Sequence, residues 1–356
     1  MTINRSAVAS LAIISMFFTF AMCVKTDDST AEDAVLLKRF FDENAPKTEA
    51  FTFNANQSFT ITTSKGSTIV FPANSLLDGT GKVVTGIVEV SVKEVRTAAD
   101  MLLSDKPTVT KDGGAMLISF GEIKVDARQN GNILRIRDTV GLNVNMAFVP
   151  NVAQIREMPL WSGDTTVSVT TSGLNSEGVK TTVTNNLPAM KGITWSQLNT
   201  SAIANPTTNK VNFLLDKLGQ WRNCDALYND VRPKTTVLGY FSTHFNNATM
   251  STYQGFAPSS LFFKPKGQNI LIKLYNLIVT PAAGKEGFYS YENSIPIGME
   301  GTFLAISTLD GKFYADMKDV TITAPASGKT FMGISFSPIE VSEANLLTKI
   351  NLLNSK

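Results

Sequence analysis

The sequence predicts a mainly β protein with two antiparallel β-sandwich-like domains, a short N-terminal helix and a C-terminal helix. Segments that alternate apolar with polar side chains, rich in β-branched residues, recur along the chain. Turn signals such as Asp78-Gly79-Thr80-Gly81 and Asn130-Gly131 separate these segments at about ten-residue spacing. The length of 356 residues suits about two domains, each large enough to bury its own core.

The composition excludes several classes of protein. Apolar residues make up 43% of the chain, and 32 Lys and Arg nearly balance 30 Asp and Glu, so nothing points to a nucleic-acid partner. One histidine and two cysteines are too few for zinc ribbons, multi-histidine metal sites or disulfide scaffolds. We therefore predict no metal and no cofactor.

Residues 1–22 have the layout of a secretory signal peptide. A head with one cation, Arg5, precedes an uncharged apolar run of about 16 residues that ends at Met22, and Cys23 follows. That run is shorter than the ~20 residues needed to cross a bilayer as a helix. A bacterial lipobox is cleaved just before a cysteine that then carries lipid; Ala21 fits this motif, whereas Met22 stands where Gly, Ala or Ser is usual. We predict lipid attachment at Cys23, with an uncleaved membrane anchor as the alternative.

The residues after Cys23 suggest where in the cell the protein is located. Lys25, Asp27 and Asp28 resemble the basic-then-acidic tag that follows the lipidated cysteine in surface-exposed lipoproteins of Bacteroidota. An ordinary solvated linker is the alternative interpretation. The expected location is the outer membrane, exposed at the cell surface, with the membrane as a partner through the lipid anchor.

The first domain is expected over residues 51–160, after a linker and short helix in residues 23–50. The helix is predicted from a cap-like Thr30 and apolar residues at near-helical spacing up to Pro46. Strands are predicted at Phe59–Thr63, Ile87–Val95 and Ile118–Val125, where the apolar period changes to two.

Residues 161–205 are rich in Thr, Ser and Asn, which predicts an exposed hairpin of Thr165–Thr171 with Val179–Thr184 and a linker at the domain boundary. Residues 206–356 form the expected second β domain. Its strands are predicted at Thr236–Ser242, Leu261–Lys264, Asn269–Tyr275, Thr302–Ser307, Asp319–Thr323 and Thr330–Ser337. Ser342 is expected to cap a final helix whose apolar face, with Leu346 and Ile350, docks on a sheet.

A family resemblance appears from Gly66 onward. Gly66-Ser-Thr-Ile-Val-Phe-Pro-Ala-Asn-Ser-Leu-Leu-Asp78, Gly81-Lys-Val-Val-Thr-Gly86 and Gly121-Glu-Ile-Lys-Val125 resemble a ZU5-like β-sandwich segment in surface lipoproteins of Bacteroidota. The match covers about Phe51 to Phe148. A second string, Leu218-Gly-Gln-Trp-Arg-Asn-Cys-Asp225, is similar to one in the same group, although Gln220 interrupts it. The resemblance implies a β fold and a location at the cell surface, and it implies no established activity.

Little in the sequence indicates catalysis. His244 is the one imidazole, and the chain contains no Gly-x-Ser-x-Gly elbow. Some ZU5 domains cleave themselves at His-Phe-Ser, but here Asn246 follows His244 and Phe245 and offers no hydroxyl. We predict a structural histidine, a buried Cys224 and no enzyme activity.

The tryptophans supply the one hint of a ligand. Trp161, Trp195 and Trp221 are candidate platforms for sugar rings, and core packing is the competing interpretation for each. The sequence thus favours a lipid-anchored envelope protein with a binding or structural role, with envelope proteins or glycans as candidate partners. The alternative is a glycan-binding component of a surface polysaccharide-uptake system.

Overall fold

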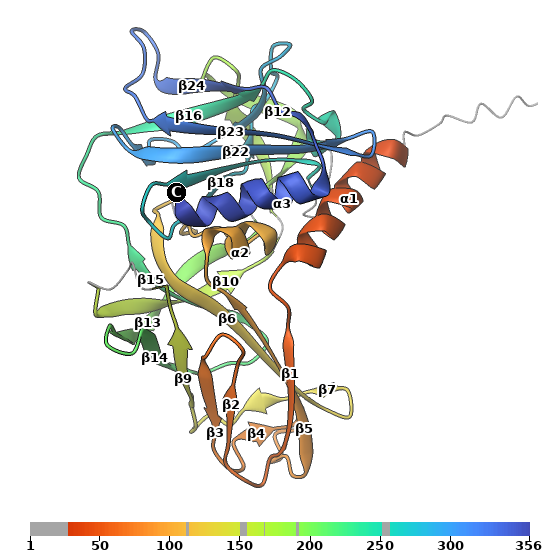
Figure 1. The fold of residues 1–356 in the computed structure, drawn as a ribbon, viewed down its shortest axis with the longest axis vertical. Coiled ribbons are helices and arrows are strands. Elements are labelled where there is room, and N and C mark those ends of the chain that lie inside the picture. Colours follow the sequence, from red (N-terminus) through yellow and green to blue (C-terminus); the bar gives the residue numbers. More distant parts are fainter. Residues whose placement is uncertain (1–27, 112–113, 150–154, 167, 190–191, 251–256) are drawn as a thin grey trace, which may run out of the picture.

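The computed structural model describes residues 28–356, except residues 112–113, 150–154, 167, 190–191 and 251–256. The described chain is mainly β and is built from large antiparallel sheets, which confirms the predicted fold class. Figure 1 shows two lobes, with the helices beside the sheets of the second lobe. Within the described residues, no helix combines the length and the apolarity needed to cross a bilayer.

The first lobe consists of one large sheet. In hydrogen-bonded order its strands are β1 (Glu49–Asn54), β5 (Ile87–Val95), β6 (Leu117–Gln129), β15 (Trp221–Leu227), β10 (Glu157–Asp164), β13 (Thr194–Asn205), β14 (Lys210–Leu215), β9 (Leu142–Ala147), β3 (Thr68–Phe71) and β2 (Phe59–Thr62). The short β7 (Asn132–Ile133) pairs with β6, and a separate pair joins β4 (Leu76–Leu77) to β8 (Arg135–Ile136).

This sheet curls around a single core. Val88, Val90 and Val92 of β5 point inward at alternate positions, because successive side chains of a strand face opposite sides of the sheet. Phe53 of β1 stacks on Phe59 of β2 with ring centroids 4.8 Å apart, so the two ends of the sheet meet.

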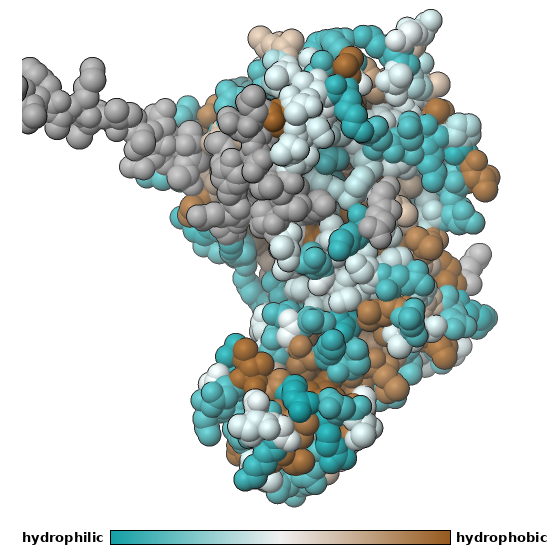
Figure 2. Space-filling view, turned by 180° about the vertical axis from the view of Figure 1, so that it is seen from behind, coloured by the Kyte–Doolittle hydropathy of each residue, from teal (hydrophilic) through white to brown (hydrophobic). Residues whose placement is uncertain are grey.

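The predicted Asn130-Gly131 hairpin joins β6 to β7, and both residues have positive φ. Two of the most exposed large apolar side chains, Ile87 and Ile133, also lie on this lobe. Seen from behind in Figure 2, apolar side chains are interspersed with polar ones over the lobe's surface.

The second lobe is a sandwich of two sheets. One contains β19 (Asn276–Leu277), β20 (Glu286–Tyr289), β16 (Lys234–Phe241) and β21 (Ile295–Pro296), with β24 (Phe331–Phe336) parallel to β16. The other, called the central sheet here, contains β18 (Ile272–Leu274), β17 (Ser259–Pro265), β22 (Glu300–Leu309), β23 (Lys312–Thr321) and β25 (Ile339–Val341).

The central sheet is buried on both faces. Phe263 and Phe303 face the other sheet of the sandwich, whereas Phe262 and Leu304 face the helices. The helical layer contains α1 (Asp28–Asn44), α2 (Ala98–Leu103) and α3 (Glu343–Leu352), while short 3₁₀ turns occur at η2 (Asn247–Met250) and η3 (Leu353–Ser355). Ser342 caps α3 through a 3.2 Å hydrogen bond from the Asn345 amide to its Oγ. Leu346 and Ile350 are fully buried, as predicted.

The sheets divide the chain differently from the predicted boundary at residues 161–205. That segment contributes the end of β10 and all of β13 to the first sheet, and β14 and β15 follow in the same sheet. The predicted hairpin does form, from β11 (Ser168–Leu174) and β12 (Lys180–Ala189), but it packs against the second lobe, where Leu174 joins a cluster with Leu238 and Phe331. Short polar side chains resemble a linker in sequence, whereas here they belong to a hairpin whose Leu174 is buried against the second lobe.

Helix α1 is fixed to the tip of the central sheet by Asp33, a carboxylate with 2% of its surface exposed. It accepts hydrogen bonds from the Asn246 Nδ2 at 3.0 Å and from the main-chain amides of Asp310 and Gly311 at 3.1 and 2.8 Å. The Thr308 hydroxyl donates to the Asp33 carbonyl at 2.8 Å.

Replacing Asp33 with alanine should lower the free energy of unfolding by about 3 kcal/mol, because one buried donor and two partly buried donors lose a charged acceptor. Urea denaturation of the full chain in detergent measures this loss. Asp42→Ala, which removes a carboxylate from the same helix at a side chain 62% exposed, is the matched control and should have little effect. Equal stability of the two variants would mean that these contacts do not hold α1 in place.

Candidate functional site

The predicted site residues have different outcomes. Cys23, the expected lipid attachment residue, lies outside the described residues. Cys224 is a free, fully buried thiol, as predicted, and burial raises its pKa well above the usual value.

The tryptophans are not exposed platforms. Trp161 is 3% exposed and Trp195 is fully buried, and both pack with Leu117 and Ile193 in one cluster against which Trp221 is partly buried. The indole Nε1 of Trp161 donates to the Asp225 carbonyl at 2.8 Å, and that of Trp195 donates to the Pro107 carbonyl at 2.9 Å. The hypothesis that Trp161 and Trp195 stack on sugar rings was therefore wrong: residues far apart in sequence meet in one buried cluster, and their polar atoms are already bonded.

His244 has structural partners. Its ring stacks on Tyr314 with centroids 4.0 Å apart, and its Nδ1 lies 2.8 Å from the Pro338 carbonyl oxygen. Its φ of 55° places it in the left-handed region, at the turn that follows β16. Among the described residues, no three His, Cys, Asp or Glu side chains come together as a metal site would require.

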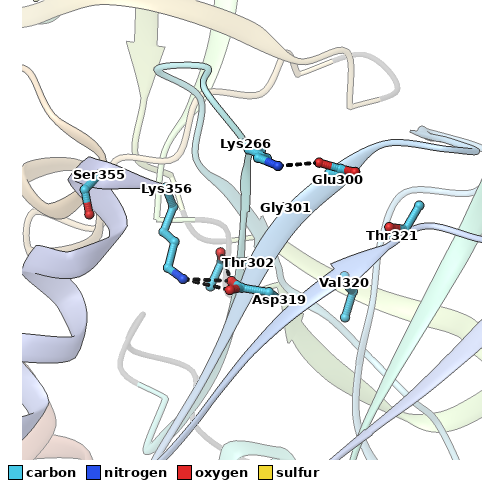
Figure 3. Close-up of a pocket in the computed structure, with 9 residues that line it drawn as sticks. All are labelled: Lys266, Glu300, Gly301, Thr302, Asp319, Val320, Thr321, Ser355 and Lys356. Atoms are coloured by element: carbon cyan, nitrogen blue, oxygen red, sulfur yellow. Dashed lines mark hydrogen bonds and ion pairs between the residues drawn. The ribbon is translucent and has the colours of Figure 1, made fainter.

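A charged pocket of about 380 Å³ opens beside the ends of β22 and β23 (Figure 3). The Lys266 Nζ lies 2.6 Å from a Glu300 carboxylate oxygen, and the Lys356 Nζ lies 2.8 Å from an oxygen of Asp319. Thr302 donates to Asp319 at 2.5 Å. The Lys266 ammonium lowers the pKa of Glu300, and Lys356, with Thr302, lowers that of Asp319.

This charged pocket can recognise a ligand with charges of both signs. Exposed ion pairs contribute little net stability, since water solvates the separated charges almost as well. A zwitterionic ligand can therefore replace the Lys266–Glu300 and Lys356–Asp319 contacts with its own at small cost. Gly301, in the pocket wall, lets β22 approach β17 closely, because a Cβ there would lie 2.6 Å from the Lys264 carbonyl oxygen.

Sequence reasoning missed two buried acids beside the tryptophans. Glu122 of β6 and Asp225 of β15 are both fully buried, on the sheet face that carries Trp221. Burial raises the pKa of Asp225 to about 7, against hydrogen bonds from Ser119 and Asn223 that lower it. Burial, with the nearby Asp225, raises the pKa of Glu122 well above its usual value. In a strand of alternating polarity both residues look like ordinary solvent-facing positions.

Comparison with known proteins gives no relative for this chain: no family description, no curated protein and no solved structure matches it. The ZU5-like resemblance therefore stays a prediction from the sequence.

Proposed function

We propose that this protein is a lipid-anchored protein of the cell envelope, exposed at the outer membrane surface, that acts by binding or structural assembly and not by catalysis. The observation that carries the proposal is the short distance along the chain between the predicted lipid site and Asp33, the residue of α1 that is hydrogen-bonded to the central sheet. Cys23 precedes Asp33 by ten positions, and the Asp33 carboxylate accepts a hydrogen bond from the Gly311 amide at the tip of the central sheet.

That spacing limits how far the folded body can lie from the membrane. Ten residues span at most about 35 Å even when fully extended. A lipidated Cys23 would keep the second lobe, to which Asp33 is hydrogen-bonded, close to the bilayer, with α1 as the point of attachment. The charged pocket of Figure 3, which contains two ion pairs that a ligand can exchange, is the surface we assign to ligand contact.

Fatty-acid labelling of cells tests the anchor. An alkyne palmitate probe should label the wild-type chain and Cys224→Ala, whereas Cys23→Ala should stay unlabelled and retain its signal segment. Cys224→Ala is the matched control because it removes the other cysteine of the chain. Label on Cys23→Ala, or none on the wild type, contradicts the proposal.

Surface exposure has its own test on intact cells. A membrane-impermeant amine reagent should modify Lys180 and Lys266, whose side chains are 71% and 69% exposed, without cell lysis. Lys273, with a 5% exposed side chain, should stay unmodified and reports that the protein is folded. Modification of Lys180 and Lys266 only after lysis would place the body on the inner side of the membrane.

A further inference from the structure

A second pocket, called the α1 pocket here, lies between α1, the turn after α2 and β18. Its volume is about 230 Å³, below the usual range for drug-sized ligands, so it suits a small molecule. Leu37 and Phe41 of α1 and Leu103 of α2 give it an apolar wall. Its polar side holds three lysines and two aspartates: Lys38, Lys106, Lys273, Asp42 and Asp105.

Among the described residues of the α1 pocket, two of the three lysines form an ion pair with a carboxylate. Lys273, with a side chain 5% exposed, is paired with Asp105 at 2.8 Å, and Lys38 is bonded to Asp42. The Lys106 Nζ donates to the carbonyl oxygens of Ser104 and Asp105 at 3.1 and 3.3 Å, and no carboxylate among the described residues lies within ion-pair distance of it. Main-chain carbonyls solvate an ammonium group but carry no net charge to balance it.

Two further observations are consistent with anion recognition in this pocket. Burial lowers the pKa of Lys106, and the pKa of Lys93 is lowered by its own burial and then by the charge of Lys106. The Ser104 Oγ, in the wall of the same pocket, is shielded from solvent and has no hydrogen-bond partner among the described residues. Buried hydroxyls are nearly always bonded, so this hydroxyl keeps a donor in the pocket wall that no described residue uses.

We propose that the α1 pocket binds a small organic anion, with a phosphate or carboxylate head between Lys106, Lys273 and the Ser104 hydroxyl and a short apolar group against Leu37 and Phe41. This inference goes beyond the proposed function, because the pocket would bind its ligand whether or not Cys23 carries lipid. The Lys106 Nζ lies 5.5 Å from the centroid of the Trp221 ring, so an anion at Lys106 should change tryptophan fluorescence.

Calorimetric titration of the full chain in detergent, at constant ionic strength, tests the proposal with n-butyl phosphate, butyrate and n-butylammonium. At least one of the two anions should bind with a fluorescence change, and the stronger one identifies the head group. The cation of matched apolar length should give neither signal. Failure of both anions to bind at millimolar concentration, or equal binding of the cation, overturns the proposal.

Three variants locate the site. Lys106→Gln should weaken anion binding at least tenfold, whereas Lys266→Gln, in the charged pocket of Figure 3, should leave it unchanged. Ser104→Ala should weaken binding several-fold while the melting temperature stays equal or rises, because the substitution removes an unsatisfied buried hydroxyl. A purely structural Ser104 would not separate affinity from stability in this way. Wild-type affinity in folded Lys106→Gln and Ser104→Ala contradicts the assignment.

Discussion

Replacing Gly287 with alanine is expected to destabilise the second lobe by about 4 kcal/mol, a large part of the stability of an ordinary domain. Gly287 lies in β20, opposite Tyr240 of β16, with φ of 154°. A Cβ at this position would lie 2.0 Å from the Gly239 carbonyl oxygen. Because that oxygen belongs to the backbone of the neighbouring strand, β16 and β20 would have to separate.

Thermal unfolding monitored by circular dichroism measures this effect, and Gly79→Ala is the matched control. Gly79 lies in the turn after β4, and a Cβ there would meet no atom within 4 Å. The control should melt with the wild type. A Gly287→Ala chain that melts within a few degrees of the wild type would show that β16 and β20 tolerate a wider spacing.

The second large effect is a loss of stability as the pH rises from about 4.5 to 7. Asp225 has a pKa near its usual 3.8 when unfolded and about 7 in the folded chain. Between those values the folded protein holds a proton on Asp225 that the unfolded chain has released. The stabilisation of the folded state by this proton is complete at low pH and is lost as the pH reaches 7. A difference of three pKa units corresponds to about 4 kcal/mol, and Glu122 adds to it in the same direction.

Urea unfolding at a series of pH values measures how the free energy of unfolding changes with pH in the wild type and in Asp225→Asn. The neutral amide has no proton to lose, and its oxygen can still accept from Asn223. The variant should therefore match the wild type at pH 4.5, exceed it at pH 7 and show a much flatter profile.

Asp126→Asn is the control for this series, since Asp126 lies on the same sheet with a side chain 33% exposed and should leave the slope unchanged. A wild-type profile that is flat or rises over this range would mean that Asp225 is ionised in the fold.

Local pattern predicted much of the secondary structure. The expected strand Ile87–Val95 matches β5 residue for residue, because one face of it packs on the core and the other meets solvent. The Asn130-Gly131 turn and the Ser342 cap also follow from preferences of a few neighbouring residues. Helix α2 was missed, since its six residues are too few for a helical period, and its capping box at Thr97 and Asp100 is a short signal.

The candidate sites could not be predicted from local sequence pattern, because each is formed by segments that lie far apart in the chain. The α1 pocket joins Lys38, Lys106 and Lys273, and the charged pocket joins Lys266 to Lys356. Each lysine by itself looks like an ordinary solvated cation.

The sequence by itself determined that this chain is mainly β, where its hairpin turns and last helix cap lie, and that an apolar segment leads to Cys23. These features depend on side chains within a few residues of one another. Tertiary structure alone decided that β14 and β15 complete the first sheet, that Trp161 and Trp195 are buried, and that Glu122 and Asp225 lose contact with water. Burial is a property of what packs against a strand, and here the covering residues come from segments distant in sequence.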